Sequence, residues 1–122
     1  MRPWIFLAGL GGVIAVGMGA YAAHGLAGDE IAQALAERGS QYQLLHCLAL
    51  LGADRVASDS RRGGVIAHLS ALLFLAGMVL FCGSLYLKAL TGQPLPVPMV
   101  TPAGGMTLMA AWLLLAVAGL RR

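Results

Sequence analysis

Charged side chains are scarce in this sequence, and their scarcity excludes most water-soluble folds. Aspartate, glutamate, lysine and arginine make up 11% of the 122 residues, whereas hydrophobic residues make up 59%. A soluble domain carries about 25% charged residues, so this chain has too few of them to cover a surface that faces water. The composition therefore excludes a soluble enzyme and favours a membrane protein, which we expect to be non-enzymatic because its parts outside the membrane are so small.

Motifs for catalysis and for cofactor or metal binding are also lacking. Cys47 and Cys82 form no CxxC pair, and we expect both to behave as small hydrophobic side chains. The stretch GLGG at residues 9–12 follows no strand, which excludes a phosphate-binding loop. Zinc ligands do not occur at usable spacings. His24 and His46 differ in expected depth by roughly 20 Å, too far apart to hold one haem between them. The sequence therefore predicts no metal and no cofactor.

Long uncharged segments are abundant instead. Residues 4–23, 65–87 and 99–120 contain no Asp, Glu, Lys or Arg, and each is longer than the roughly 18 residues that a helix needs to cross about 30 Å of hydrocarbon. Residues 42–53 form a shorter segment. It reaches spanning length if its helix begins near Glu30 and its polar first turns lie in the headgroup layer or against other helices. We predict an all-α integral membrane protein, a transmembrane four-helix bundle with one domain over residues 1–122.

Prolines, glycines and capping residues indicate where the helices begin and end. Pro3 suits a first helical turn, and Asp29 is a good N-cap after the glycines of HGLAGDE. The prolines of TGQPLPVP cannot lie inside a helix and form a loop. The predicted helices cover residues 3–26, 30–56, 64–89 and 101–120, and the second has a weak point or bend at Gly39-Ser40.

The basic residues segregate to one side of the predicted bundle. With four spans, the side that carries both termini holds six of them and the opposite side only two, Arg38 and Lys88; the six are Arg2, Arg55, Arg61, Arg62, Arg121 and Arg122. Lys and Arg accumulate on the cytoplasmic side of membrane proteins, so we expect both termini in the cytoplasm. Because these residues form no stripe on a soluble face, the net charge of +3 does not indicate a nucleic-acid partner.

The first 23 residues also resemble a secretory signal peptide, with a basic start, an apolar core and an Ala-x-Ala sequence that ends at Ala22. The apolar run is longer than a usual signal core. We therefore expect this segment to be retained as the first helix.

Polar side chains within the predicted spans gather toward the outer half. Counted from Arg55 at about 1.5 Å per residue, Gln43 lies roughly 18 Å into the membrane, whereas His46, at roughly 13 Å, is the deep exception. Burial of such groups costs a few kcal/mol each unless they are hydrogen-bonded, so they should point into the bundle. We predict one polar pocket in the outer half, serving either as interhelical glue or as a functional site, formed by His24, Tyr42, Gln43, His46, Ser84, Tyr86 and Thr101.

Small residues recur every four positions along the first helix. Such stripes let helix backbones approach closely in a membrane. The stripe predicts tight packing inside the bundle or, alternatively, a homo-oligomer interface; it consists of Gly11, Ala15, Gly19 and Ala23.

Four stretches resemble a known family. GAYAAHGL, YQLLHCLALL, LFCGSLYLKALTG and VTPAGGMTLMAAWLLLA are similar, in this order and over nearly the whole chain, to signature stretches of the YgdD-like family, domain of unknown function 423. The resemblance implies a small four-span protein of the bacterial inner membrane and no established activity. Its pattern falls on Gly19, His24, Gly25, Tyr42, Gln43, His46, Gly83, Ser84, Tyr86, Thr91, Gly92, Thr101, Pro102, Gly104, Gly105 and Trp112.

The family pattern also implies roles for residues outside the pocket. We expect helix packing from Gly83, Gly104, Gly105 and Trp112. The chain departs from the pattern by exchanges among small residues at Ala22, Cys82 and Ala111, which leave the polar set intact. His68 is not part of the pattern, which argues against a ligand pair with His46.

Two functions remain open on this evidence. The first is a binding, accessory or assembly protein within a larger membrane complex or a homo-oligomer, because the parts outside the membrane are very small. The alternative is a small transporter or channel, or a lipid- or quinone-binding protein, that uses the polar pocket. In both cases the surrounding partners are membrane lipids.

Overall fold

The computed structural model describes residues 2–59 and 64–121, and within these ranges the chain forms four α-helices and no strand. The helices are α1 (Pro3–His24), α2 (Glu30–Asp59), α3 (Gly64–Thr91) and α4 (Val100–Leu120). The expected all-α, four-helix fold is thus confirmed, with each predicted boundary within three residues of the observed one. α2 continues without a break through Gly39 and Ser40, where the sequence predicted a weak point.

Local chemistry accounts for the helix ends. Pro3 occupies the first turn of α1, where its missing N–H leaves no bond unmade. The Asp29 carboxylate accepts a hydrogen bond from the backbone N–H of Ala32 at 3.1 Å, which confirms the predicted N-cap of α2. Directly after α3, Gly92 adopts a φ of 70°, a left-handed conformation that suits glycine and ends helices.

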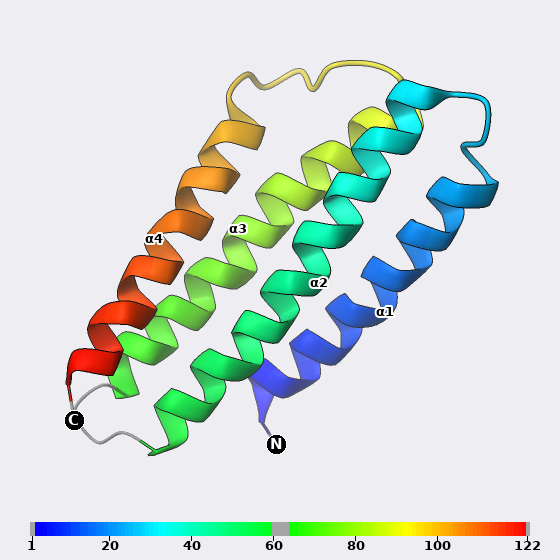
Figure 1. The fold of residues 1–122 in the computed structure, drawn as a ribbon. Coiled ribbons are helices and arrows are strands. Elements are labelled where there is room, and N and C mark those ends of the chain that lie inside the picture. Colours follow the sequence, from blue (N-terminus) through cyan, green and yellow to red (C-terminus); the bar gives the residue numbers. More distant parts are fainter. Residues whose placement is uncertain (1, 60–63, 122) are drawn as a thin grey trace.

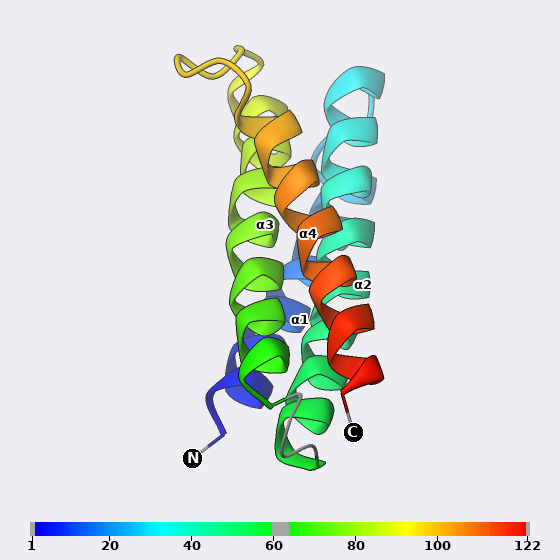
Figure 2. The same ribbon diagram turned by 90° about the vertical axis from the view of Figure 1, so that its left-hand side faces the viewer.

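α2 and α3 form the centre of the bundle, and α1 and α4 lie at its flanks. α1 packs against α2, α2 against α3, and α3 against α4, as Figure 1 shows. Viewed from the α4 side, α4 lies in front of the central pair and α1 behind it (Figure 2). Both termini lie at one end of the bundle, here called the terminal end; the α1–α2 and α3–α4 connections lie at the other, the far end (Figure 1).

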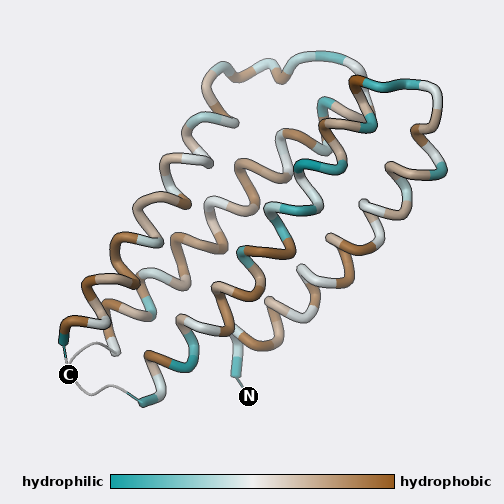
Figure 3. Tube along the Cα trace, viewed as in Figure 1, coloured by the Kyte–Doolittle hydropathy of each residue, from teal (hydrophilic) through white to brown (hydrophobic). Residues whose placement is uncertain are grey.

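The outer surface of the bundle is strongly apolar. Val13, Val65 and Leu113 are each at least 69% exposed, as expected for side chains that face lipid rather than water. α1, α3 and α4 are long and apolar enough to cross a membrane. α2 differs because its hydrophilic residues concentrate in the half toward the far end (Figure 3). The most polar helix is therefore one of the two central ones.

The small-residue stripe of α1 faces α2, with one correction. A Cβ atom at Gly11 would lie 2.6 Å from Cys47 Sγ, and Ala15 is fully buried. Ala23, however, is exposed, and Ala22 is buried in its place. Steps of four residues turn a helix by about 400°, so the predicted stripe drifts by about 40° per step. After Gly19 the residue that contacts α2 is therefore three positions later, at Ala22, instead of four positions later, at Ala23.

The glycines carried over from the family pattern behave differently from one another. A Cβ atom at Gly104 would lie 2.5 Å from the backbone nitrogen of Phe81, so α4 touches the main chain of α3 at this point. At Gly105 the nearest atoms belong to the Phe81 ring, at 3.7 Å. Gly83 was expected to pack helices, but a Cβ atom there would meet nothing within 4 Å. The expectation was wrong for Gly83, because this residue faces open space beside α3.

Candidate functional site

The structure divides the predicted polar pocket into three separate groups. Because α2 has neighbours on several sides, consecutive residues of this helix point toward different partners. One group joins α2 to α4, the second joins α2 to α3, and the third joins α3 to α4. The groups are Tyr42 with His46 and Trp112, Gln43 with Tyr86, and Ser84 with Thr101.

His46 is the centre of the first group, an aromatic cluster between α2 and α4. The indole N–H of Trp112 donates to His46 Nε2 at 3.1 Å, and His46 Nδ1 lies 2.6 Å from the Tyr42 carbonyl oxygen. Because an indole N–H can only donate, Nε2 must accept and Nδ1 carries the proton. The ring of Tyr42 stacks on the imidazole, and Phe74 packs edge-on against Trp112. Both ring nitrogens of the buried His46 are therefore hydrogen-bonded, Nδ1 within α2 and Nε2 to Trp112 of α4.

The aromatic cluster forms one wall of a groove between α2 and α4. The groove has a volume of about 600 Å³. Tyr42, His46 and Trp112 line it from two helices, and Leu108 and Met109 complete its apolar surface. The imidazole presents no free nitrogen to this groove, because both nitrogens are already hydrogen-bonded.

Gln43 and Tyr86 form the second group, on the α1 side of the central pair. The Tyr86 hydroxyl donates to Gln43 Oε1 at 2.6 Å. Gly39 makes room for the phenol ring, since a Cβ atom there would lie 2.6 Å from Tyr86 Cε1. Gln43 and Tyr86 both line a second groove, of about 380 Å³, between α1 and α3.

Ser84 and Thr101 form the third group, near the far end. Their hydroxyls share a hydrogen bond of 2.5 Å, and Ser84 also donates to the Phe81 carbonyl at 2.8 Å. His24 joins none of the three groups and is exposed at the end of α1. Its place in the predicted pocket was wrong. His24 is two residues from buried Ala22, so its side chain points about 200° away, to the opposite face of α1.

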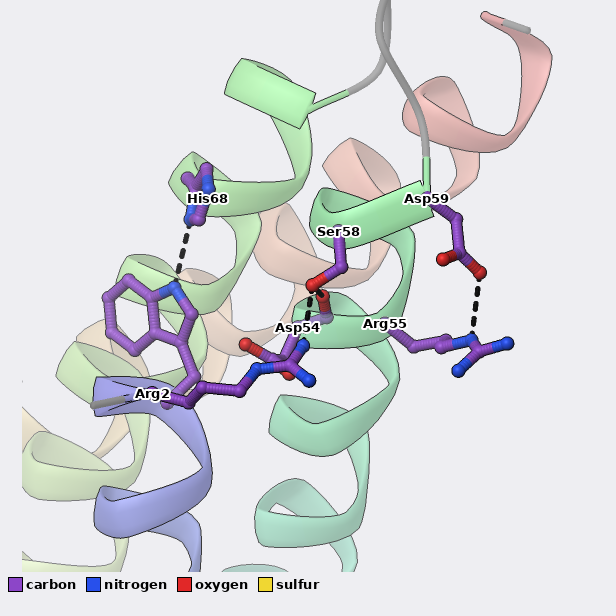
Figure 4. Close-up of polar contacts among 7 residues, drawn as sticks. Arg2, Asp54, Arg55, Ser58, Asp59 and His68 are labelled. Carbon is purple, nitrogen blue, oxygen red and sulfur yellow. Dashed lines mark hydrogen bonds and ion pairs between the residues drawn. The ribbon is translucent and has the colours of Figure 1, made fainter.

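Sequence reasoning missed a polar network at the terminal end (Figure 4). Arg2 pairs with Asp54 and contacts Ser58, both at 2.5 Å, and the Asp54 side chain is only 10% exposed. The indole N–H of Trp4 donates to His68 Nδ1 at 2.9 Å. These contacts bind the first turn of α1 to α2 and α3. The available signal was Asp54 itself, an acid placed at the end of an apolar run.

Serine hydroxyls supply further links between helices that the sequence did not reveal. Ser40 donates to the Ala15 carbonyl at 2.6 Å and links α2 to α1. Ser70 donates to the Ala111 carbonyl at 2.8 Å and links α3 to α4. Such interhelical bonds stabilise helix pairs where no water competes. Within the described ranges, no three His, Cys, Asp or Glu side chains gather in a way that could hold a metal ion.

Comparison with known proteins identifies the family. Residues 18–105 match the family described as "Protein of unknown function (DUF423)". The chain belongs to the DUF423 family. This match confirms the resemblance that the four sequence stretches indicated, and it covers the second and third polar groups as well as His46 and Tyr42.

Relatives of this DUF423 chain are membrane proteins. It is 35% identical to the UPF0382 membrane protein YwdK of Bacillus subtilis, over 99% of this chain and 98% of the relative. A UPF0382 membrane protein of Haemophilus influenzae is 37% identical over 94% and 91%, and the UPF0382 inner membrane protein YgdD of Escherichia coli is 34% identical over 98% and 91%. No solved structure matches the chain significantly. The DUF423 chain is therefore a membrane protein of a family without an established activity.

Replacing His46 with alanine in this DUF423 chain should leave the Trp112 N–H without its acceptor. The loss of one partner of a partly buried hydrogen bond costs about 1–3 kcal/mol. We also expect the Trp112 emission to shift to shorter wavelength, because the indole no longer hydrogen-bonds. The chain has two tryptophans, so a Trp4→Phe background isolates the signal. An unchanged emission spectrum in that background would contradict the His46–Trp112 bond.

Proposed function

We propose that this chain is a non-catalytic, multi-pass protein of the bacterial inner membrane, with both termini in the cytoplasm, that acts by lateral association with a second copy of itself. The orientation is supported by the terminal end, which carries three described arginines, Arg2, Arg55 and Arg121. Arg38 and Lys88 belong to the far halves of α2 and α3.

The observation that carries the proposal is the uncovered face of α2. Ala34, Arg38, Gln41, Leu45, Leu48 and Gly52 follow one another at alternating steps of four and three residues, and every one of them is exposed. This spacing is the heptad seam by which two helices pack along their length. α2 contacts α1 and α3 and, through His46, also α4, and the exposed seam lies beside these contacts, where one further helix can pack.

The charges on this face argue for a partner. Glu37 and Arg38 are both exposed, and neither forms an ion pair or side-chain hydrogen bond with another described residue. Ser40 and Gln33 bond to the carbonyls of Ala15 and Ala22. Glu37 lies between Gln33 and Ser40 along α2. Its depth in the bundle is therefore between those of Ala22 and Ala15, within the length of α1. Charged residues in membrane helices generally face a protein partner or water rather than lipid.

A second copy fits this face because the charges are self-complementary. Two copies in one membrane share the same orientation, so a two-fold axis along the membrane normal places equivalent residues at equal depth. Arg38, a member of the seam, then approaches Arg38 of the other copy. Glu37 flanks the seam one residue earlier, so its carboxylate lies beside Arg38 of the other copy and offsets the repulsion between the two guanidinium groups. Gln41, one turn further in, faces its equivalent, and two amides can exchange hydrogen bonds. Leu45, Leu48 and Gly52 continue the contact through the apolar half of α2.

Energy transfer between copies that carry donor and acceptor fluorescent proteins at the C-terminus tests the proposal. Reversal of one charge, Glu37→Arg or Arg38→Glu, should weaken association at least roughly tenfold, because like charges then face each other. The double exchange Glu37→Arg with Arg38→Glu should restore it. Lys88→Glu is the matched control, an exposed charge change at the far end of α3.

Each part of the proposal can fail separately. Fluorescent proteins exported through the general secretory route do not fluoresce, so dark fusions would overturn the orientation. Bright fusions without energy transfer, or a double exchange that fails to restore it, would overturn the α2 interface. Gentle extraction followed by native mass analysis adds a third readout: a different protein bound in place of a second copy would refute self-association.

The alternative of a small transporter or channel draws less support from the geometry. The intramembrane groups best suited to a polar path, His46, Tyr86 and Ser84, are hydrogen-bonded to residues of neighbouring helices. Their present use is to hold α2, α3 and α4 together. This supports a structural role for the polar groups, and with it a protein that acts through its surface.

A further inference from the structure

The groove between α1 and α3 has the dimensions of a small-molecule site. Its volume is about 380 Å³, within the range of roughly 300–1,000 Å³ found for ligand pockets. It exists because α1 packs against α2 rather than against α3. Leu10, Ile14 and Val79 line it and are 48%, 53% and 65% exposed. The groove is therefore open sideways, on the apolar surface that faces lipid.

One donor in this groove, the side-chain amide nitrogen of Gln43, has no acceptor among the residues that the structure describes. The Tyr86 hydroxyl donates to Oε1 of Gln43, so the amide nitrogen Nε2 is directed elsewhere. Nε2 donates to no acceptor among the described residues. Every buried side-chain nitrogen or oxygen atom of these residues has a hydrogen-bond partner, so an atom without one cannot be buried. Nε2 is therefore accessible, and it lies beside Gly11, where a Cβ atom would be 3.7 Å away. Gln43 and Gly11 both line the groove.

Gly83 keeps the α3 wall of the groove open. Glycine destabilises a helix interior relative to alanine, and close contact with another helix is the usual reason for its presence. Here a Cβ atom would meet nothing within 4 Å, so helix packing does not account for the residue. Gly83 lines this groove and also a neighbouring groove of about 500 Å³ toward the α3–α4 connection, and a Cβ atom added at this position would enter open space.

The depth of Gln43 restricts the chemistry of a ligand. Its amide nitrogen is next to Gly11, near the middle of α1 (Pro3–His24). If α1 spans the membrane, the amide lies near the midplane, about 15 Å from either edge of the hydrocarbon layer. The ester carbonyls of a phospholipid stay at the edge with the charged headgroup. An acceptor at mid-depth must belong to a molecule that is apolar as a whole.

We propose that the groove binds an isoprenoid quinone. A ring carbonyl of the quinone accepts a hydrogen bond from Gln43 Nε2, and the isoprenoid tail lies along Leu10, Ile14 and Val79. The bond satisfies a donor that has no water to bind at this depth. The proposal concerns binding alone, and it is independent of the α2 interface, which uses other residues of α2.

Binding of a 1,4-benzoquinone with a decyl tail to the purified full-length protein in lipid nanodiscs tests the site. We expect one saturable site per chain. Gly83→Leu should weaken binding at least tenfold by occupying the groove. Gly12→Leu is the matched control, because a Cβ atom at Gly12 also meets nothing within 4 Å and Gly12 does not line the groove. Gln43→Leu should weaken quinone binding about tenfold, the effect of one lost hydrogen bond to a ligand.

Decylbenzene, which has the same tail but no carbonyl, separates the hydrogen bond from apolar contact. Its affinity should be lower than that of the quinone in the wild type and unchanged by Gln43→Leu. Equal affinities of the wild type and Gly83→Leu for the quinone would overturn the site. Displacement of the quinone by phosphatidylethanolamine at equal concentration would overturn the assignment to quinones. Energy transfer between Gly83→Leu copies should equal that of the wild type, so failure of the groove and failure of the dimer are distinguishable.

Discussion

Replacement of Gly104 by leucine should separate α4 from α3 and destabilise the bundle by about 3 kcal/mol or more, the upper range for overpacking. A Cβ atom at this position would lie 2.5 Å from the backbone nitrogen and 2.9 Å from the Cα of Phe81. A main chain cannot rotate out of the way as a flexible side chain can, so a whole helix must move. Unfolding of the purified protein by dodecyl sulfate in mixed micelles, followed by Trp112 fluorescence, measures the loss.

Gly119→Leu is the matched control for this change. Gly119 is also in α4, but a Cβ atom there would meet nothing within 4 Å. We expect its midpoint to equal or exceed that of the wild type, because leucine is the better helix former. If Gly104→Leu and Gly119→Leu unfold at the same fraction of dodecyl sulfate, the close approach of α3 and α4 does not hold in the membrane protein.

Arg2→Ala should destabilise the terminal end by about 1–3 kcal/mol, because it leaves a carboxylate that is 10% exposed without its cation, and the Arg2 side chain itself is 54% exposed. The Asp54 side chain is 10% exposed and its ion pair with Arg2 spans α1 and α2. The same mixed-micelle unfolding measures the effect. Most of the expected loss is the penalty for the unpaired Asp54, so the double variant Arg2→Ala with Asp54→Asn should recover about half of it.

Arg55→Ala provides the comparison for this ion pair. Arg55 pairs with Asp59 at 2.8 Å within α2, but the two side chains are 80% and 59% exposed. Exposed pairs of this kind contribute about 0–1 kcal/mol, so Arg55→Ala should change stability little. Two results would show that the Arg2–Asp54 pair does not join α1 to α2 as a partly buried ion pair. One is an equal loss of stability in Arg2→Ala and Arg55→Ala. The other is a double variant at Arg2 and Asp54 that is less stable than Arg2→Ala.

Uncharged length and capping chemistry were sufficient to predict the helices. Residues 4–23, 65–87 and 99–120 contain no Asp, Glu, Lys or Arg, and in each case a helix covers nearly the whole run. Asp29 marked the start of α2 because an N-cap acts within its own turn. These signals are local. They depend on the residues of each segment and on the lipid or water around it, and hardly on which helices pack against one another.

The grouping of polar residues could not be predicted, because it depends on the neighbours of α2. Tyr42 and Gln43 are adjacent in sequence and about 100° apart on a helix, so in a helix with neighbours on several sides they turn toward different partners. The Tyr42 ring stacks with His46 in the α4 contact, whereas Gln43 bonds to Tyr86 of α3. A prediction that all polar residues of the bundle point to one common centre fails for a helix that packs against other helices on several sides. The same assumption placed exposed His24 inside the bundle.

The order of helix contacts has a consequence for biosynthesis. Since each helix packs mainly against the next one in sequence, α1 and α2 can pair as a hairpin while the ribosome is still translating α3. Arg2 pairs with the carboxylate of Asp54 in α2. Trp4, however, donates its hydrogen bond to His68 in α3. The amino-terminal turn thus acquires its last anchor only when the third helix has been delivered to the insertion machinery. Truncated chains that stop before residue 68 should therefore keep the α1–α2 pair but lack the Trp4–His68 bond, and the first turn of α1 should be more open to protease than in the full chain.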